Sequence, residues 1–219
     1  MKTRLVLRHR ILSQILCFMV LAGCLSIAGT SHATVLGEIW LNQPENGSSG
    51  LLSTVPVTTP DAEFNTSAIN YDSRVTGYTP ALFFNNPTFF NTSGAFNPNG
   101  SLDDTLALFT GQTYLNAGNN TFTTTHDDGF ELSVPGVGFD LQQGGPFPPT
   151  PITYTITAPS AGLYDFSLSY FEGWGPPATL NYEVNGVPVG VPEPSTFVLL
   201  LVGAASFAVT AVYRKKMTA

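Results

Sequence analysis

Residues 120–134 read Asn120-Thr-Phe-Thr-Thr-Thr-His-Asp-Asp-Gly-Phe-Glu-Leu-Ser-Val134 and give the clearest indication of the fold. It opens with a threonine-rich run, passes through Asp127-Asp128-Gly129, and closes with residues 130–134, in which apolar and polar residues alternate. Threonine and aromatic residues favour strands, whereas aspartate and glycine favour tight turns. The stretch therefore predicts two strands that are joined by a short acidic turn.

The same mixture of strand and turn residues fills positions 34–190, and no amphipathic helix is evident there. Strands are predicted at residues 35–41, 81–84, 106–115, 120–125, 130–134, 152–157, 163–171 and 179–184. Along 163–171 an aromatic and apolar set alternates with polar residues and predicts one buried face: Tyr164, Phe166, Leu168 and Tyr170. Residues 85–100 are predicted to form a long polar loop. Many short strands with frequent turns are typical of an all-β antiparallel sandwich.

The first 33 residues have the pattern of a signal peptide. A basic start is followed by an apolar run, which predicts a signal helix, and then by the small-x-small site Ser31-His32-Ala33. Cleavage by signal peptidase after Ala33 would begin the mature chain at Thr34. An alternative is a lipobox at residues 21–24, which would make Cys24 a lipidated N-terminus.

The C-terminal residues 191–219 form a sorting cassette rather than a domain. Val191, Pro192, Glu193 and Pro194 precede an apolar run at 196–213, which is near the lower length limit for a transmembrane helix. The basic residues 214–216 follow, and they predict a cytoplasmic C-terminus. The cassette resembles the PEP-CTERM signal of Gram-negative bacteria. This resemblance implies recognition by an exosortase, a transient inner-membrane anchor, and release to the cell surface or exopolysaccharide matrix. The alternative is a plain anchor that is not processed.

The two ends hold most of the basic residues and both cysteines. Between them, residues 34–190 contain fourteen acidic residues but only Arg74 as a basic one, so their formal charge is −13. This charge argues against nucleic-acid binding. The mature segment has no cysteine and a single histidine, His126, which excludes disulfides, a thiol nucleophile and a histidine-based metal site or triad.

The order of motifs from about residue 103 to residue 184 resembles the PA14 β-sandwich family. In that family a strand ends in Asp-Asp-Gly, as at 127–129. A later strand has the form Tyr-x-Phe-x-Leu-x-Tyr-x-Glu, as at 164–172, and leads into a loop and a last strand. The resemblance implies a PA14-like antiparallel β-sandwich for residues 34–190.

The resemblance also implies a site. In sugar-binding PA14 adhesins the two aspartates are joined by a cis peptide and hold calcium, which ligates sugar hydroxyls. Carried over, Asp127 and Asp128 are calcium ligands, and adjacent carboxylates suit the oxygen preference of this ion. Glu172 stands where those adhesins use an asparagine and is the expected third ligand. Trp174 is a candidate platform for stacking a sugar, and His126 flanks the turn as a candidate ligand-binding residue.

The function expected from these features is a calcium-assisted carbohydrate-binding module on a secreted or surface-attached biofilm-matrix protein, not an enzyme. Two alternatives are open. In one, Asp-Asp-Gly is only a β-turn in a structural matrix protein that binds no ligand. In the other, Asp128 and Glu172 are the paired carboxylates of a glycoside hydrolase. A second aspartate pair, Asp103-Asp104, is interpreted as a loop feature before a strand.

Overall fold

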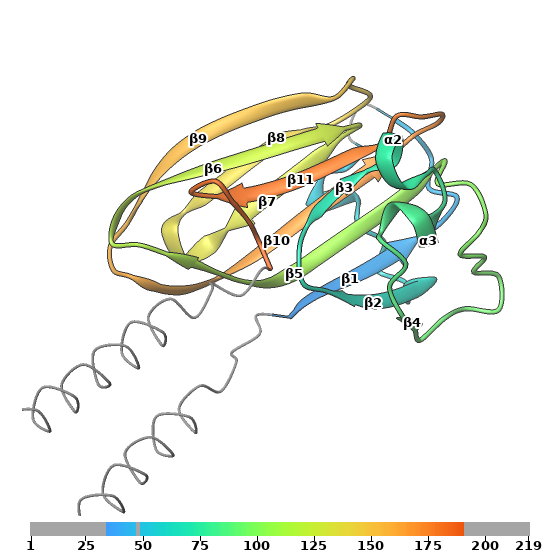
Figure 1. Cartoon of the computed structure of the whole chain (residues 1–219), viewed down its shortest axis with the longest axis horizontal. Helices are drawn as coiled ribbons and strands as arrows, with labels where there is room; N and C mark the ends of the chain where they lie inside the picture. Colours follow the sequence, from blue (N-terminus) through green and yellow to red (C-terminus); the bar gives the residue numbers. More distant parts are fainter. Residues whose placement is uncertain (1–33, 47–48, 191–219) are drawn as a thin grey trace, which may run out of the picture. The chain divides into compact units, whose positions relative to one another are not determined.

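In the computed structural model, which describes residues 34–46 and 49–190, the strands form two antiparallel sheets (Figure 1). The larger sheet has the order β4-β2-β1-β5-β10-β7-β8, and the smaller sheet has the order β12-β11-β6-β9, with β3 also paired to β11. The strands are β1 (Val35–Trp40), β2 (Ala62–Thr66), β3 (Asn70–Asp72), β4 (Phe89–Phe90), β5 (Thr105–Leu115), β6 (Gly118–Asp127), β7 (Phe130–Val134), β8 (Phe139–Gln143), β9 (Thr150–Ala158), β10 (Gly162–Glu172), β11 (Thr179–Val184) and β12 (Val187–Pro188). The predicted all-β sandwich is confirmed.

Seven of the eight predicted strands are present, and the strand predicted at 81–84 is wrong. That segment lies in the helix α3 (Pro80–Phe83). The side chain of Thr79 accepts a hydrogen bond from the backbone N–H of Leu82, and proline occupies the first helical turn. Both features favour the start of a helix, and they outweigh the strand propensity of the aromatic residues. The remaining helical segments are α2 (Ser73–Thr76), η1 (Leu52–Thr54) and η2 (Pro135–Val137).

The predicted alternation along β10 is confirmed only in part. Phe166, Leu168 and Tyr170 are buried in the main core between the sheets. The opposite face is also buried near the end of the strand, because Phe171 packs with Trp40 and Leu106 in a second, smaller cluster. Glu172, the last residue of β10, lies on the same face as Tyr170 and is also buried, with only 1% of its surface exposed.

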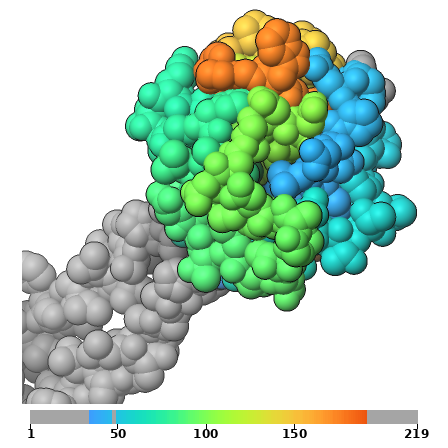
Figure 2. Space-filling model, turned by 90° about the vertical axis from the view of Figure 1, so that its right-hand side faces the viewer, coloured from blue at the N-terminus to red at the C-terminus, as the bar shows by residue number. Residues whose placement is uncertain are grey.

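The segment between β4 and β5 lies across one end of the sandwich, and most of its residues are exposed. Figure 2 shows this segment, in green, across the middle of that face. Phe89 lies within the predicted loop but pairs in β4 and contacts Phe64 of the core, with ring centroids 5.7 Å apart. On its other side Phe89 meets Phe96 at 4.9 Å. The phenylalanine rings therefore hold this otherwise polar segment against the core.

The predicted terminal segments lie outside the described residues. These are the signal peptide with Ala33, the sorting motif from Val191 to Pro194, and the apolar run 196–213. Within 34–46 and 49–190, no helix has the length and apolar character that a membrane crossing requires.

Candidate acidic site

The acidic turn lies where β6 passes into β7, and it is fastened to the end of β10. The backbone N–H of Asp128 donates to the carbonyl of Phe171 (3.1 Å), and the N–H of Phe171 donates to the carbonyl of Gly129 (2.9 Å). The peptide bond between Asp127 and Asp128 is cis, as the resemblance implied. Glycine is required at 129, since a Cβ there would lie 2.1 Å from the carbonyl oxygen of Ser49.

Three carboxylates meet at this junction. Asp127 and Asp128 come from the turn, Glu172 comes from the end of β10, and their ligand oxygens all lie within 4.8 Å of one another. Asp127 and Glu172 are buried, with 6% and 1% of their surface exposed. The sequence-predicted metal ligands are thus brought together in an acidic cluster that could hold a metal ion.

Two tyrosine hydroxyls hold Glu172. Tyr78 donates to its Oε1 (2.8 Å), and Tyr170 donates to its Oε2 (2.9 Å). Each hydroxyl has a second contact, because Tyr78 also lies 2.7 Å from Oδ1 of Asp103, and Tyr170 also reaches the carbonyl oxygen of Asp127. A hydroxyl carries one hydrogen and cannot donate to two acceptors at once. A proton on Glu172 would supply one of the missing hydrogens.

The pKa values of the cluster agree with this shortage of protons. Burial, against the opposing effect of the two tyrosines, raises the pKa of Glu172 to about 9, and the charges of Asp128 and Asp127 add to the rise. Burial and the neighbouring Asp128 raise the pKa of Asp127 to about 7. Crowded carboxylates disfavour ionisation. A bound cation would reverse this, since it stabilises the ionised forms of all three.

Asp128 also organises the loops around the cluster. Its Oδ1 accepts a hydrogen bond from the backbone N–H of Phe147 (3.1 Å), and its Oδ2 accepts one from the N–H of Gly173 (2.8 Å). Phe147 lies in the loop before β9, and Gly173 begins the loop after β10. One carboxylate therefore ties together two loops that are distant in the sequence.

These two loops and the acidic cluster line a pocket of about 330 Å³. The loops lie side by side, as the yellow and orange segments at the top of Figure 2 show. The lining residues are the three carboxylates, Glu45, Pro146, Phe147, Pro148, Pro149, Trp174, Gly175, Pro176 and Pro177. Trp174 borders the pocket and is 77% exposed. The structure therefore combines carboxylates with an exposed aromatic ring at one opening.

His126 lies behind the turn and is not among the residues that line the pocket. It is fully buried, and its ring packs against Phe130 with centroids 4.3 Å apart. Its Nδ1 contacts the carbonyl oxygen of Asp128, and its Nε2 lies 3.0 Å from Oε1 of Gln143. Burial lowers the pKa of His126. His126 therefore supports the turn from the protein interior.

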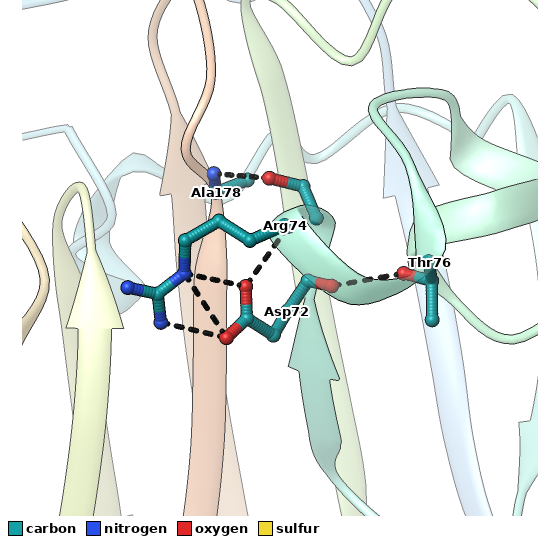
Figure 3. A network of polar contacts seen from close by, with 5 residues as sticks. Asp72, Arg74, Thr76 and Ala178 are labelled. Carbon is teal, nitrogen blue, oxygen red and sulfur yellow. Dashed lines mark hydrogen bonds and ion pairs between the residues drawn. The ribbon is translucent and has the colours of Figure 1, made fainter.

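The acidic cluster has no ion pair with a lysine or arginine among the described residues. Arg74 is the basic residue of the segment 34–190, and its guanidinium is engaged by both carboxylate oxygens of Asp72 (Figure 3), with an ion-pair distance of 2.6 Å. Asp72 also caps helix α2 by accepting from the backbone N–H of Arg74 (2.9 Å). The charge of Arg74 lowers the pKa of Asp127, but burial outweighs it.

The sequence analysis missed several residues around the cluster. Asp103 precedes β5 as predicted, yet its Oδ1 accepts from the backbone N–H of Gly175 (2.9 Å), next to Trp174, and lies 2.7 Å from the hydroxyl oxygen of Tyr78. The Oε2 atom of Glu45 lies close to Gly173, since a Cβ added at residue 173 would be 3.1 Å from it. Nothing in the local sequence marks Tyr78 or Glu45, since both arrive from distant loops. The doublet Asp103-Asp104 was a visible signal.

The domain and the C-terminal cassette are similar to different known proteins. The described part of the chain is similar to the PA14 domain of the antifreeze protein MpAFP (18% identity, TM-score 0.55, covering 68% of this chain and 80% of that one). It is equally similar to the PA14 sugar-binding domain of an RTX adhesin (18% identity, TM-score 0.55, covering 72% and 94%).

The described domain has the PA14 fold. At the C-terminus, residues 190–216 match the PEP-CTERM protein-sorting motif. This match confirms the sorting cassette that the sequence predicted and indicates export and sorting to the cell surface. A search of curated proteins gave no match.

Proposed function

We propose that the PA14-type domain binds glycan through a calcium ion held by Asp127, Asp128 and Glu172. The observation that carries this proposal is the convergence of three carboxylates beside an exposed tryptophan in one pocket. Calcium takes six to eight oxygen ligands and accepts carboxylates in one- or two-oxygen modes. The three side chains leave room for further oxygens, which sugar hydroxyls would supply.

The surroundings of the cluster support binding rather than hydrolysis. A general acid of a glycosidase must reach the glycosidic oxygen. Glu172 has the raised pKa of such an acid, but it is 1% exposed and both of its oxygens contact tyrosine hydroxyls. A buried carboxyl whose oxygens are held by two hydroxyls suits a fixed metal ligand better than a general acid. Trp174, exposed at the rim, suits stacking on a sugar face.

The sorting motif supports the proposal that this module acts outside the cell. Export and surface sorting, followed by exosortase processing, would bring the acidic domain to the cell surface or to an exopolysaccharide matrix of a Gram-negative bacterium. The domain boundaries at residues 33 and 190, with signal-peptidase cleavage after Ala33, belong to the same proposal.

The test compares glycan binding and thermal unfolding with and without calcium. We expect calcium to raise the melting temperature, and we expect retention on a polysaccharide array that EGTA abolishes. Asp127→Asn should lose both effects. Asp165→Asn is a matched control, since Asp165 lies exposed on β10 and its carboxylate accepts a hydrogen bond from the side chain of Gln112 (2.8 Å). An equal calcium response in Asp127→Asn and the wild type would contradict the proposal.

A further inference from the structure

Strand β9, at the rim of the smaller sheet, has an open edge (Figure 1). It pairs with β6 over nine residue pairs, from Gly118↔Ala158 to His126↔Thr150. Among the described residues, its backbone forms no hydrogen bond outside that ladder. The backbone groups along its outer side are therefore available for pairing with another strand.

The register shows which residues of β9 face outward. In an antiparallel ladder, successive residues direct their N–H and C=O groups to opposite neighbours. The N–H of Asn185 donates to the carbonyl of Thr121 (2.7 Å), one step beyond the pair Val184↔Phe122. The odd-numbered residues of β6 therefore bond toward β11 and the even-numbered ones toward β9.

Through this register, the even-numbered residues of β9 bond to β6 and the odd-numbered ones face outward. The outward residues are Pro151, Thr153, Thr155 and Thr157. Pro151 supports this assignment independently, because proline has no N–H and is tolerated in sheets where an edge strand faces solvent. The outer edge thus offers three N–H donors and four carbonyl acceptors.

This edge lacks the protection that the other sheet edges have. Natural edges are shortened, charged or covered to prevent strand pairing. Among the described residues, the other edge strands are short: β4 and β12 have two residues each, β3 has three, and β8 has five, with Asp140 exposed. By contrast, β9 has nine residues and no charge.

The absence of charge extends beyond the strand itself. Residues 141–164 contain no charged side chain, although the segment 34–190 carries a formal charge of −13. The negative charge that would keep two copies apart is therefore missing from this edge. Threonine, isoleucine and tyrosine, which make up most of β9, also favour strand pairing.

We infer that β9 pairs antiparallel with β9 of a second copy of this chain, about a two-fold axis at Thr155. In this register Thr155 faces its own copy, and Thr153 faces Thr157. Each of the outward threonine N–H groups then meets a carbonyl, and both Pro151 residues lie at the ends of the ladder. Such a self-complementary contact is the form that two-fold dimers take.

The pairing has a consequence for ligand binding that rests on the proposed function. Pro149, the residue before β9, lines the acidic pocket. Antiparallel pairing directs the starts of the two β9 strands to opposite ends of the joined sheet, so the two pockets point apart. A dimer would therefore bridge two glycan chains, and its apparent affinity for a polymer would exceed that of one site.

The first test is the mass of the full chain in detergent, measured by light scattering over a range of concentrations. We expect a dimer for the wild type and for Thr155→Val, which keeps the N–H and favours strands. Thr155→Lys should raise the dimer dissociation constant at least tenfold, because two like charges would face each other across the axis. The hydrophobic ends are common to all three proteins, so they do not account for a difference between them.

The second test locates the contact by disulfide cross-linking in a Cys17→Ser, Cys24→Ser background. Thr155→Cys should cross-link to its own copy, since Cα atoms about 5.5 Å apart in such a pair fall within the range of disulfides. Thr123→Cys, on the central strand β6, is the control and should stay uncross-linked. A monomer at every concentration, a folded Thr155→Lys protein that dimerises like the wild type, or equal cross-linking of the two cysteine variants would overturn the inference.

Discussion

Two aspartate doublets of the same composition have different surroundings in this domain. Asp127-Asp128 lies between the sheets, and its carboxylates converge with that of Glu172. Asp103-Asp104 lies in an exposed loop, and the carboxylate of Asp103 accepts from the hydroxyl of Ser101 and the backbone N–H of Gly175 and contacts the hydroxyl of Tyr78. Burial raises the pKa of Asp127 to about 7, whereas the hydrogen bonds to Asp103 lower the pKa of that carboxyl despite some burial. The same dipeptide therefore belongs to a buried acidic cluster at one position and anchors an exposed loop at the other.

The largest expected difference between the doublets is in stability. Asp128→Ala removes an acceptor from two backbone N–H groups, those of Phe147 and Gly173, and should lower the free energy of unfolding by about 2–4 kcal/mol. Asp103→Ala should lower the free energy of unfolding by about 1 kcal/mol, because the partners of Asp103 can form hydrogen bonds with water instead. Urea unfolding followed by circular dichroism measures both. Equal losses would show that the two carboxylates do the same structural work.

A second expected difference concerns the protonated state of Glu172. Its pKa of about 9 means that the carboxyl is mostly neutral at pH 7 in the calcium-free protein. Glu172→Gln should therefore leave the calcium-free stability nearly unchanged, while it lowers calcium affinity at least tenfold through the loss of one ligand charge. Urea unfolding and calcium titration of the same protein separate the two effects. A large loss of calcium-free stability would contradict a neutral Glu172.

The stability of the buried cluster is expected to depend on pH. Asp127 and Glu172 have pKa values raised from 3.8 and 4.5 to about 7 and about 9. A raised acid pKa stabilises the fold below the unfolded value, and this contribution is lost as the pH rises through the folded value. The calcium-free protein should therefore lose stability between about pH 4 and pH 9. Calcium competes with these protons, so the calcium-induced rise in melting temperature should be larger at about pH 8.5 than at about pH 5.5.

The smallest expected effect on stability comes from Trp174. Because it is 77% exposed, Trp174→Ala should change the free energy of unfolding by no more than about 0.5 kcal/mol. Glycan affinity should fall about tenfold if the ring stacks on a sugar, while calcium affinity stays the same. Tyr114→Ala, at a distant exposed aromatic position on β5, is the control. Unchanged glycan retention would remove Trp174 from the site.

Local patterns in the sequence predicted much of this structure. The strands 130–134 and 179–184 were predicted with their observed bounds, since each is flanked by clear turn residues. The grouping of Asp127, Asp128 and Glu172 was expected from the resemblance to the PA14 family, not from a local pattern. Segment 81–84 failed because capping by Thr79 and Pro80 outweighed strand propensity.

The residues that complete the site could not be predicted in the same way. Tyr78 lies 94 positions before Glu172, and Glu45 comes from another loop of the first half of the chain. Their contacts depend on how loops cross at the end of the sandwich, and no periodicity records such a crossing. The last residues of β10 were likewise predicted to bury only one face. Burial of Phe171 on the opposite face could not be predicted, because it packs in a cluster with Trp40 and Leu106, which are distant in the sequence.

Calcium binding at Asp127-Asp128 can be tested by calorimetry on the wild type, Asp127→Asn and Asp103→Asn. The two variants remove one carboxylate each from doublets of identical composition. We predict one calcium ion per chain for the wild type and Asp103→Asn, and an affinity weaker by on the order of 100-fold for Asp127→Asn, as expected when one charge of a buried cluster is lost. No calcium binding by the wild type, or equal binding by Asp127→Asn, would contradict a calcium site at this cluster.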